Sequence, residues 1–221
     1  MIPTLSFEEY LRFEALADVR HEYVGGHVYA MSGAVLRQGL LAQAINVRLD
    51  AGFLPRGCRV HTHDSKIRTP EGSVYYPDIY VTCRPIDDRR YDTDAEWVVE
   101  IRSPSTATTD DREKSLAYRR LPSIQGYLLA DPDLRYLELR TAVDIGWHTV
   151  RVGDGGYVDI GPARLDVTEI FDELDRLAPR GGTETDATSP RGIHRVMTLL
   201  SFTGASDGTM QALAIIVTLW R

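Results

Sequence analysis

Hydrophobic residues recur along this chain in two periods, and each period predicts one type of secondary structure. Apolar positions about 3.6 residues apart, introduced in places by capping residues such as Ser6, indicate helices with one buried face. Alternating or short continuous apolar runs between turn residues indicate β-strands. We predict helices over residues 6–17, 34–52, 110–121 and 167–177. We predict strands over residues 57–67, 74–82, 97–101, 125–130 and 134–141, and hairpins over 21–31 and 147–160.

The order of these elements predicts a mixed α/β or α+β protein built on a sheet. The character of the chain changes after Pro179, where a stretch over 180–192 rich in Gly, Thr, Ser and Asp is typical of a linker. We therefore predict one folded domain over residues 1–178, followed by a linker and C-terminal tail over 179–221. The apolar residues over 194–221 fit an extra helix, a disordered tail or translation in an altered reading frame, and the sequence leaves these three open.

Length and composition bound the classes of protein to which this chain can belong. Its 221 residues suffice for one sizeable core, and 43% hydrophobic and 26% charged residues are ordinary for a globular protein. The net charge of −7 argues against a protein that coats DNA by bulk electrostatics. Contact with nucleic acid must therefore use a local basic patch, or a metal ion that bridges acidic side chains to phosphate.

Membrane insertion and secretion find no support in the sequence. The longest late apolar run, over 212–220, is about half the roughly 18–20 residues that a membrane-spanning helix needs. The N-terminal segment contains early acids and lacks the basic and apolar blocks of a signal peptide. Cys58 and Cys83 are too few for a disulfide framework, so we predict a reducing, cytoplasmic environment.

Lysine is nearly absent from this chain. Of 25 basic residues all but two are arginines, and the two lysines are Lys66 and Lys114. A lysine ammonium is a compact point charge whose pKa shifts on burial, whereas an arginine guanidinium is delocalised and always charged. A lysine retained against such a bias is therefore a candidate for chemistry that arginine cannot perform.

Two acidic residues lie within otherwise apolar strands. Asp78 follows Pro77 in the run VYYPDIYVTC, and Glu100 lies in WVVEIRSPS. Each charge needs a partner, because burying it alone is costly. One explanation pairs both acids with the chain's many arginines, and the other directs them to one cleft that binds Mg²⁺, which prefers carboxylate oxygens. Glu100 and Arg102 share a strand face, so Arg102 could balance the charge of a transition state.

These segments resemble a known family. The two runs, with the second continuing as TATTDDREKSLAYRRLPSIQGYLLADP, and the segment HEYVGGHVYAMSGA resemble the bacterial Uma-two family of predicted restriction endonucleases, members of the PD-(D/E)XK nuclease superfamily. The similarity covers about residues 4–177 in several ordered blocks. It implies a restriction-endonuclease-like core, in which a central mixed β-sheet is flanked by helices and the acids cluster at one edge of the sheet.

The resemblance also implies roles for single residues. Asp78 matches the aspartate of the family's Pro-Asp motif, and Glu100 matches the glutamate of its Glu-x-x-Ser-Pro-Ser-Thr block. Lys114 matches a lysine moved onto the following helix in Asp-x-x-x-Lys, and the alternative is a solvated lysine paired with Asp110. Glu22 matches an acid that completes the metal site, and the alternative is a surface acid on a hairpin. The implied catalytic residues are Asp78, Glu100 and Lys114, and the implied metal ligands are Asp78, Glu100 and Glu22.

Two positions depart from the family pattern. Many relatives have a histidine near Gln38 and Gly39, and leucine is usual where this chain has Arg102. Both departures favour an alternative function, a catalytically decayed nuclease-fold module that binds nucleic acid or a protein partner. The retained acids and lysine favour the enzyme.

Other motifs carry weaker signals. Cys58, His61, His63 and Asp64 suggest a zinc site, but no paired-cysteine or His-Glu-x-x-His motif accompanies them. Tyr118 could pack over the cleft, although an aromatic residue on a helix face usually belongs to the core. The sequence lacks phosphate-loop, dinucleotide-binding and nucleophile-elbow motifs, so NTP hydrolysis, dinucleotide binding and α/β-hydrolase chemistry have no support.

The sequence therefore predicts a cytoplasmic, Mg²⁺-dependent endonuclease that hydrolyses DNA phosphodiester bonds, with Mn²⁺ able to replace Mg²⁺. The metal would polarise the phosphate and activate a water molecule. Lys114 would orient that water or offset the charge that develops on the phosphate. The predicted partner is DNA, and no association with a membrane is predicted. A homodimer is expected only by analogy with nucleases that cut both strands.

Overall fold

The structure is a computed structural model that describes residues 4–31, 35–85, 89–102, 109–179, 197–202 and 211–216. It contains two compact units, one formed by Met1–Ser32 and Thr185–Arg221 and the other by Gly33–Glu184. We describe each unit by itself. The predicted domain boundary at residue 178 stays a prediction.

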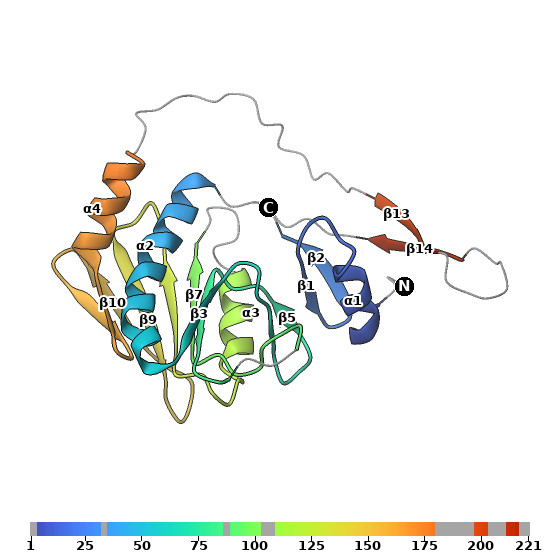
Figure 1. Ribbon diagram of the computed structural model, residues 1–221, viewed down its shortest axis with the longest axis horizontal. Coiled ribbons are helices and arrows are strands. Elements are labelled where there is room, and N and C mark those ends of the chain that lie inside the picture. Colours follow the sequence, from blue (N-terminus) through green and yellow to red (C-terminus); the bar gives the residue numbers. More distant parts are fainter. Residues whose placement is uncertain are drawn as a thin grey trace. The chain divides into compact units, whose positions relative to one another are not determined.

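A six-stranded mixed sheet forms the centre of the larger unit (Figure 1). Its strand order is β10-β9-β8-β7-β6-β3, and β7 and β8 run parallel while the other neighbouring pairs are antiparallel. The strands are β3 (Arg59–Thr62), β6 (Ile79–Thr82), β7 (Trp97–Ile101), β8 (Gly126–Ala130), β9 (Tyr136–Ala142) and β10 (Trp147–Gly153). The prediction of a central mixed sheet flanked by helices is confirmed.

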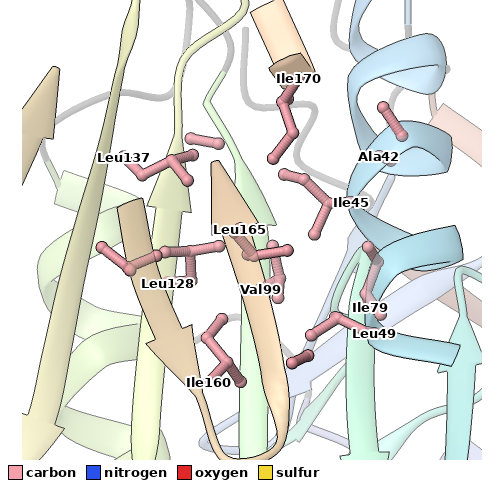
Figure 2. Packing of buried hydrophobic residues seen from close by; sticks show 14 of the residues in the cluster. Ala42, Ile45, Leu49, Ile79, Val99, Leu128, Leu137, Ile160, Leu165 and Ile170 are labelled. Atoms are coloured by element: carbon pink, nitrogen blue, oxygen red, sulfur yellow. The ribbon is translucent and has the colours of Figure 1, made fainter. Parts of the chain in front are cut away.

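Helices and one hairpin cover the two faces of this sheet. They are α2 (Leu36–Phe53) with the short 3₁₀ helix η1 (Leu54–Arg56), α3 (Thr109–Tyr118), α4 (Val167–Leu177), and the hairpin of β11 (Tyr157–Ile160) and β12 (Ala163–Asp166). The hydrophobic core unites α2, α4 and the hairpin with one face of the sheet (Figure 2). Helix α3 contacts the opposite face, where Ser115 accepts hydrogen bonds from Arg140 and Trp147. The two faces therefore differ in what covers them.

Strand alternation decides which residues enter the core. Ile79 and Val99, which are paired across β6 and β7, are fully buried against α2, and Leu128 on β8 continues the layer. Ile45 and Leu49 of α2 meet them from the helix side (Figure 2). Because successive side chains of a strand point to opposite faces, the alternate residues of β6, β7 and β9 face α3 instead.

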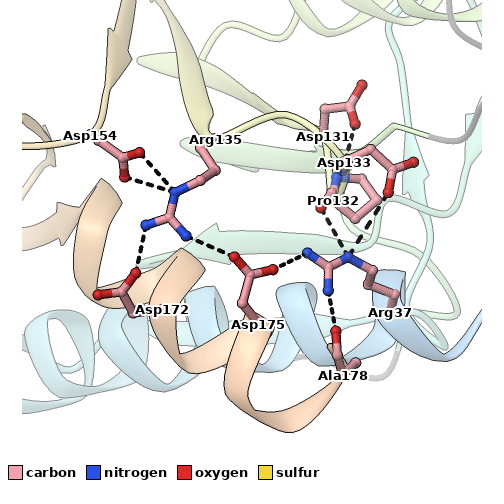
Figure 3. A network of polar contacts seen from close by, with 9 residues as sticks. All are labelled: Arg37, Asp131, Pro132, Asp133, Arg135, Asp154, Asp172, Asp175 and Ala178. Atoms are coloured by element: carbon pink, nitrogen blue, oxygen red, sulfur yellow. Dashed lines mark hydrogen bonds and ion pairs between the residues drawn. The ribbon is translucent and has the colours of Figure 1, made fainter. Parts of the chain in front are cut away.

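An ionic network holds α4 in place (Figure 3). Arg135, just before β9, donates to Asp154, to Asp172 at 2.6 Å and to Asp175 at 2.8 Å. Arg37 at the start of α2 also binds Asp175, and it donates to the backbone carbonyls of Pro132 and Ala178. The network ties the C-terminal half of α4 to α2 and to the loop between β8 and β9.

Two strands predicted as continuous are interrupted in the structure. The segment 57–67 divides into β3 and β4 (Ile67–Arg68), and 74–82 divides into β5 (Val74–Tyr75) and β6. The first break contains His63, whose φ of 23° is incompatible with a strand. The second contains Pro77, which has no N–H to donate to a ladder. The predictions of two long strands were therefore wrong in extent.

The smaller unit contains α1 (Phe7–Glu14) and the hairpin of β1 (His21–Val24) and β2 (His27–Ala30). The predicted cap of α1 is confirmed, because Ser6 accepts from the Glu9 amide at 3.3 Å and Glu9 accepts from the Ser6 amide at 2.7 Å. Gly25 and Gly26 both have positive φ, which a two-residue hairpin turn requires. The glycine pair is therefore the reason that the hairpin turns here.

The C-terminal region of the smaller unit contributes a pair of antiparallel strands, β13 (Met197–Phe202) and β14 (Gln211–Ile216). Of the three alternatives left open for this region, an extra helix is wrong for these residues. The predicted linker over 180–192 lies outside the described residues.

Cys58 and Cys83 are joined by a disulfide, which links the start of β3 to the end of β6. A single bridge is not a disulfide framework, but it removes the cysteine argument for a reducing environment. A cytoplasmic location therefore stays a prediction. Among the described residues no helix has the length and apolar character needed to cross a membrane.

Candidate active site

A row of side chains, five of them ionisable, crosses the sheet on the face that α3 covers. The β6–β7 register pairs Ile79 with Val99, and its continuation by one residue places Asp78 opposite Glu100. The β7–β8, β8–β9 and β9–β10 registers continue the row through Leu129, Glu138 and Arg151. Residues opposite one another on neighbouring strands point to the same face. The row is therefore His63, Asp78, Glu100, Leu129, Glu138 and Arg151, read from the β3 edge to the β10 edge.

Asp78 lies just before β6 and is fixed by the backbone of the next strand. Its Oδ2 accepts a hydrogen bond of 2.7 Å from the Ile101 amide, at the end of β7. Its Oδ1 lies 3.4 Å from Nδ1 of His63. The side chain keeps 23% of its exposure, so solvent or a ligand can reach it. Asp78 thus has a fixed orientation without being sealed off.

Glu100 is the second carboxylate of the site and contacts two side chains of α3. Its Oε1 accepts a hydrogen bond of 3.0 Å from the Tyr118 hydroxyl and lies 3.6 Å from the Lys114 ammonium. Lys114 and Tyr118 are four residues apart, which places them on one face of a helix. Helix α3 therefore presents an ammonium and a hydroxyl to the same carboxylate oxygen.

Lys114 is buried, with 8% of its surface exposed, and its ammonium lies 6.0 Å from the ring centre of Tyr75. The alternative of a solvated lysine is therefore wrong. Its suggested partner, the side chain of Asp110, lies outside the described residues. Tyr118 is fully buried and also bonds to Glu100, so it combines the core role with a contact to the site.

Histidine 63 supplies a titratable positive charge beside Asp78. Its pKa is raised above the ordinary value by the hydrogen bond to Asp78, and this effect exceeds the opposing effect of burial. From the sequence, His63 was a candidate only for a zinc site with Cys58, His61 and Asp64. That site is contradicted for Cys58, whose sulfur is in the disulfide, and the His61 ring instead stacks on Tyr80 with centres 4.8 Å apart.

The far end of the row has a different chemistry. Glu138 is 4% exposed and binds three guanidinium groups, those of Arg102, Arg140 and Arg151. Arg102 also donates to the Tyr136 hydroxyl at 3.0 Å. The interpretation that Arg102 shares a face with Glu100 is compatible with the register, but its charge is directed toward β9.

Glu22, the third predicted metal ligand, lies on β1 in the smaller unit, and its role stays a prediction. In the part of the chain that the structure describes, no group of three or more His, Cys, Asp or Glu side chains is arranged to hold a metal ion. The larger unit by itself thus brings together two of the three predicted ligands, together with Lys114.

Comparison with known proteins identifies the family of this chain. The model of the Uma2 (Uma-two) family, described as "Putative restriction endonuclease", matches residues 7–171, well over half of the chain. The chain belongs to the Uma2 family. The expected family is confirmed, and a nuclease is the activity that its description names.

Individual relatives agree with this assignment. Two uncharacterized proteins of Synechocystis sp. (strain PCC 6803) are 35% identical over 134 residues and 26% identical over 132 residues. Each alignment covers 58% of this chain, and they cover 68% and 75% of those relatives. A crystal structure from Anabaena variabilis, titled as a putative nuclease belonging to DUF820, has a TM-score of 0.65 at 16% identity and covers 77% of this chain and 99% of that one. At this identity the likeness shows the fold alone.

The structure also shows what surrounds Gln38 and Arg102, the two positions expected from the sequence to depart from the family pattern. Gln38 is buried in the first turn of α2, accepts from the Val35 amide and donates to the Arg102 carbonyl at 3.1 Å. It ties the helix to the end of β7. Arg102 in turn is held by Glu138 and Tyr136. Both residues have structural partners in this chain.

Proposed function

We propose that this protein is a metal-dependent endonuclease that hydrolyses DNA phosphodiester bonds. The observation that carries the proposal is the pairing of Asp78 and Glu100 across neighbouring strands, with the buried ammonium of Lys114 beside Glu100. Membership of the Uma2 family supports hydrolysis of nucleic acid. DNA as the substrate, the metal and a homodimer go beyond that support and are part of the proposal.

The donor set fits Mg²⁺ or Mn²⁺ better than zinc. Mg²⁺ is bound in many enzymes by one or two carboxylates, with waters and substrate phosphate as its other ligands, so two carboxylates suffice. A structural zinc site would need four protein ligands, mostly cysteine and histidine, which the row does not supply. Asp78 and Glu100 would hold the ion, and a bound divalent ion would polarise the phosphate and lower the pKa of a water molecule.

The protein's own residues prepare the site in three ways. The Ile101 amide fixes Asp78, and the Tyr118 hydroxyl fixes Glu100, so neither carboxylate has to reorient when substrate arrives. Lys114 places a positive charge at 3.6 Å from Glu100, where it can orient a water molecule and stabilise negative charge on the reacting phosphate. Burial by α3 strengthens this electrostatic effect, because fewer water molecules screen the charge.

A plasmid-cleavage assay tests the proposal. The full chain is incubated with supercoiled DNA in Mg²⁺, in Mn²⁺ and in EDTA, and nicked and linear products are measured. We expect cleavage that requires the divalent ion and that Asp78→Asn abolishes. Asp159→Asn is the matched control, because Asp159 is an exposed acid paired with Arg164 on the β11–β12 hairpin.

The two candidate functions give different results in this assay. Cleavage that survives Asp78→Asn would contradict the proposed site. DNA binding without cleavage in either metal would instead support the decayed module, which is the second candidate.

A further inference from the structure

A basic pocket lies at the β3 edge of the sheet, beside the candidate active site. Its volume is about 210 Å³, which suits a small group rather than a whole cofactor. Strands β3 and β6 form one side, and the segment 89–92 forms another. Its described lining contains five cationic side chains, Arg59, Lys66, Arg84, Arg89 and Arg90.

The charges in this pocket do not balance. Only two acids, Asp64 and Asp92, belong to the described lining. Arg84 is neutralised by Asp94, but the Asp92 carboxylate accepts from the Thr93 and Asp94 amides and serves the local turn. The described lining therefore keeps an excess of positive charge in a chain whose net charge is −7.

Arg59 lines the pocket from β3. Its Nε is fully buried and has no hydrogen-bond partner among the described residues. A buried guanidinium N–H without an acceptor is costly. The Arg59 side chain also lines the pocket, where an anionic ligand can bind its guanidinium. The position of Arg59 is fixed, because it pairs with Thr82 in the β3–β6 ladder next to the disulfide.

Aromatic rings add to the character of the pocket. His61 and Tyr80 stack with their planes 18° apart, and both line the pocket. Burial lowers the pKa of His61 and so favours its neutral ring. Basic groups around an aromatic surface are typical of sites that bind nucleotides and nucleic-acid strands.

The walls of the pocket are held together by backbone hydrogen bonds. The Arg68 amide donates to the Asp92 carbonyl at 2.8 Å, and the Asp92 amide donates to the Lys66 carbonyl at 2.8 Å. Lys66 itself donates to the Tyr76 hydroxyl at 3.0 Å. A preformed pocket of this kind needs little reorganisation when a ligand binds.

The pocket adjoins the carboxylate row. Tyr80 lies two residues after Asp78 on the same face of the strand, and His61 lies two residues before His63. Two residues of a strand span about 7 Å, so a group in the pocket lies next to a phosphate held at Asp78. A single extended nucleic-acid strand can therefore reach both places.

We propose that this pocket binds a phosphate group, with Arg59 and Arg90 among its anion contacts. When a nucleic-acid backbone supplies the phosphate, the pocket holds the strand beside the reacting bond, and in this form the inference rests on the proposed function. A free nucleoside monophosphate offers the same chemistry and is the other source that the test distinguishes.

Binding without cleavage tests the pocket separately from the enzyme. A fluorescein-labelled 20-base-pair duplex is titrated with the full chain in EDTA, and anisotropy is measured at several salt concentrations. We expect Arg59→Gln and Arg90→Gln each to weaken binding about fivefold or more and to reduce the salt dependence by about one phosphate contact. Arg164→Gln, which removes an exposed arginine elsewhere, is the matched control.

A second arm titrates inorganic phosphate and adenosine monophosphate by calorimetry. If these bind, and both pocket variants abolish the binding while the duplex does not bind, the phosphate comes from a small molecule and the pocket is still supported. If both variants bind every probe as the unmodified chain does, or no probe binds, the pocket proposal is overturned.

Because Asp78→Asn should abolish cleavage but not this binding, failure of one proposal does not imply failure of the other. Arg90 is exposed, so its variant remains informative even if Arg59→Gln folds poorly.

Discussion

Glu100 and Glu138 lie in one row on one face of the sheet, yet their surroundings are opposite. Glu138 is bound by three guanidinium groups, which exceed its single charge. Near Glu100 and Asp78 the described residues include Lys114 and a histidine that is charged only when protonated. The first acid is fully satisfied by the protein, whereas the second belongs to a pair that an added cation would stabilise.

This difference distinguishes the acid that has only structural partners from the acid that we propose binds the metal, where sequence and burial do not. Both glutamates occupy strand positions among apolar residues, and both side chains are nearly buried, at 12% and 5% exposure. Only the partners differ, and the partners come from different elements: α3 for Glu100, and β9, β10 and the end of β7 for Glu138.

Glu100→Gln and Glu138→Gln should have opposite consequences for activity. We expect Glu100→Gln to reduce plasmid cleavage about 10³-fold, because loss of a metal-binding carboxylate removes several kcal/mol of transition-state stabilisation. Glu138→Gln should change cleavage by less than about threefold once the folded fraction is accounted for. Equal losses in both variants would mean that the row works as one catalytic unit and that the distinction fails.

Lys114→Met should reduce cleavage about 100-fold with little change in DNA binding, because in the proposed mechanism the ammonium acts on the reacting phosphate and water. Lys114→Arg should not restore activity, since the planar guanidinium is larger than the compact ammonium and does not fit the same buried position. Arg112→Gln, on an exposed position of the same helix, is the control. Full activity of Lys114→Arg would show that only the charge matters.

Glu138→Gln should lower the free energy of unfolding by about 2 kcal/mol at pH 7, a value reduced because Arg151 is more than half exposed. Burial would raise the pKa of Glu138, but hydrogen bonds from Arg151 and Arg140 outweigh it and lower the pKa from the ordinary 4.5. A lowered pKa contributes stability above pH 4.5 that is lost as pH falls through the folded-state value. Urea unfolding should therefore show the two proteins converging below about pH 4.5. A difference that does not vary with pH would contradict the ionic role.

Tyr118→Phe should have the smallest effect. It removes one hydrogen bond to Glu100, worth about 1 kcal/mol of interaction energy, and preserves the ring packing. We expect cleavage to fall about fivefold. Tyr127→Phe, which removes another buried hydroxyl on the same face, provides the comparison. If both variants lose the same activity, the effect of Tyr118 comes from packing rather than from orienting Glu100.

The sequence predicted an element well where the residues that cause it lie close together in the chain. The cap at Ser6 and Glu9 and the turn at Gly25 and Gly26 depend on residues a few positions apart, and both formed as expected. Strand lengths were less accurate, because His63 takes a positive φ within an apparently continuous pattern. Family motifs identified Asp78, Glu100 and Lys114 as candidates, but they said nothing of the contacts that surround them.

The sequence by itself determined the residue types, the mixed sheet and the family to which the chain belongs. Tertiary structure alone decided that Lys114 is buried against Glu100, that His63 faces Asp78, and that Glu138 is saturated with arginines. Strand register and helix docking bring together residues 13 positions apart, as for Arg151 and Glu138, and 38 positions apart, as for Tyr75 and Glu113. Periodicity records which way a side chain points, whereas the charge that meets it there depends on which strands and helices pack together.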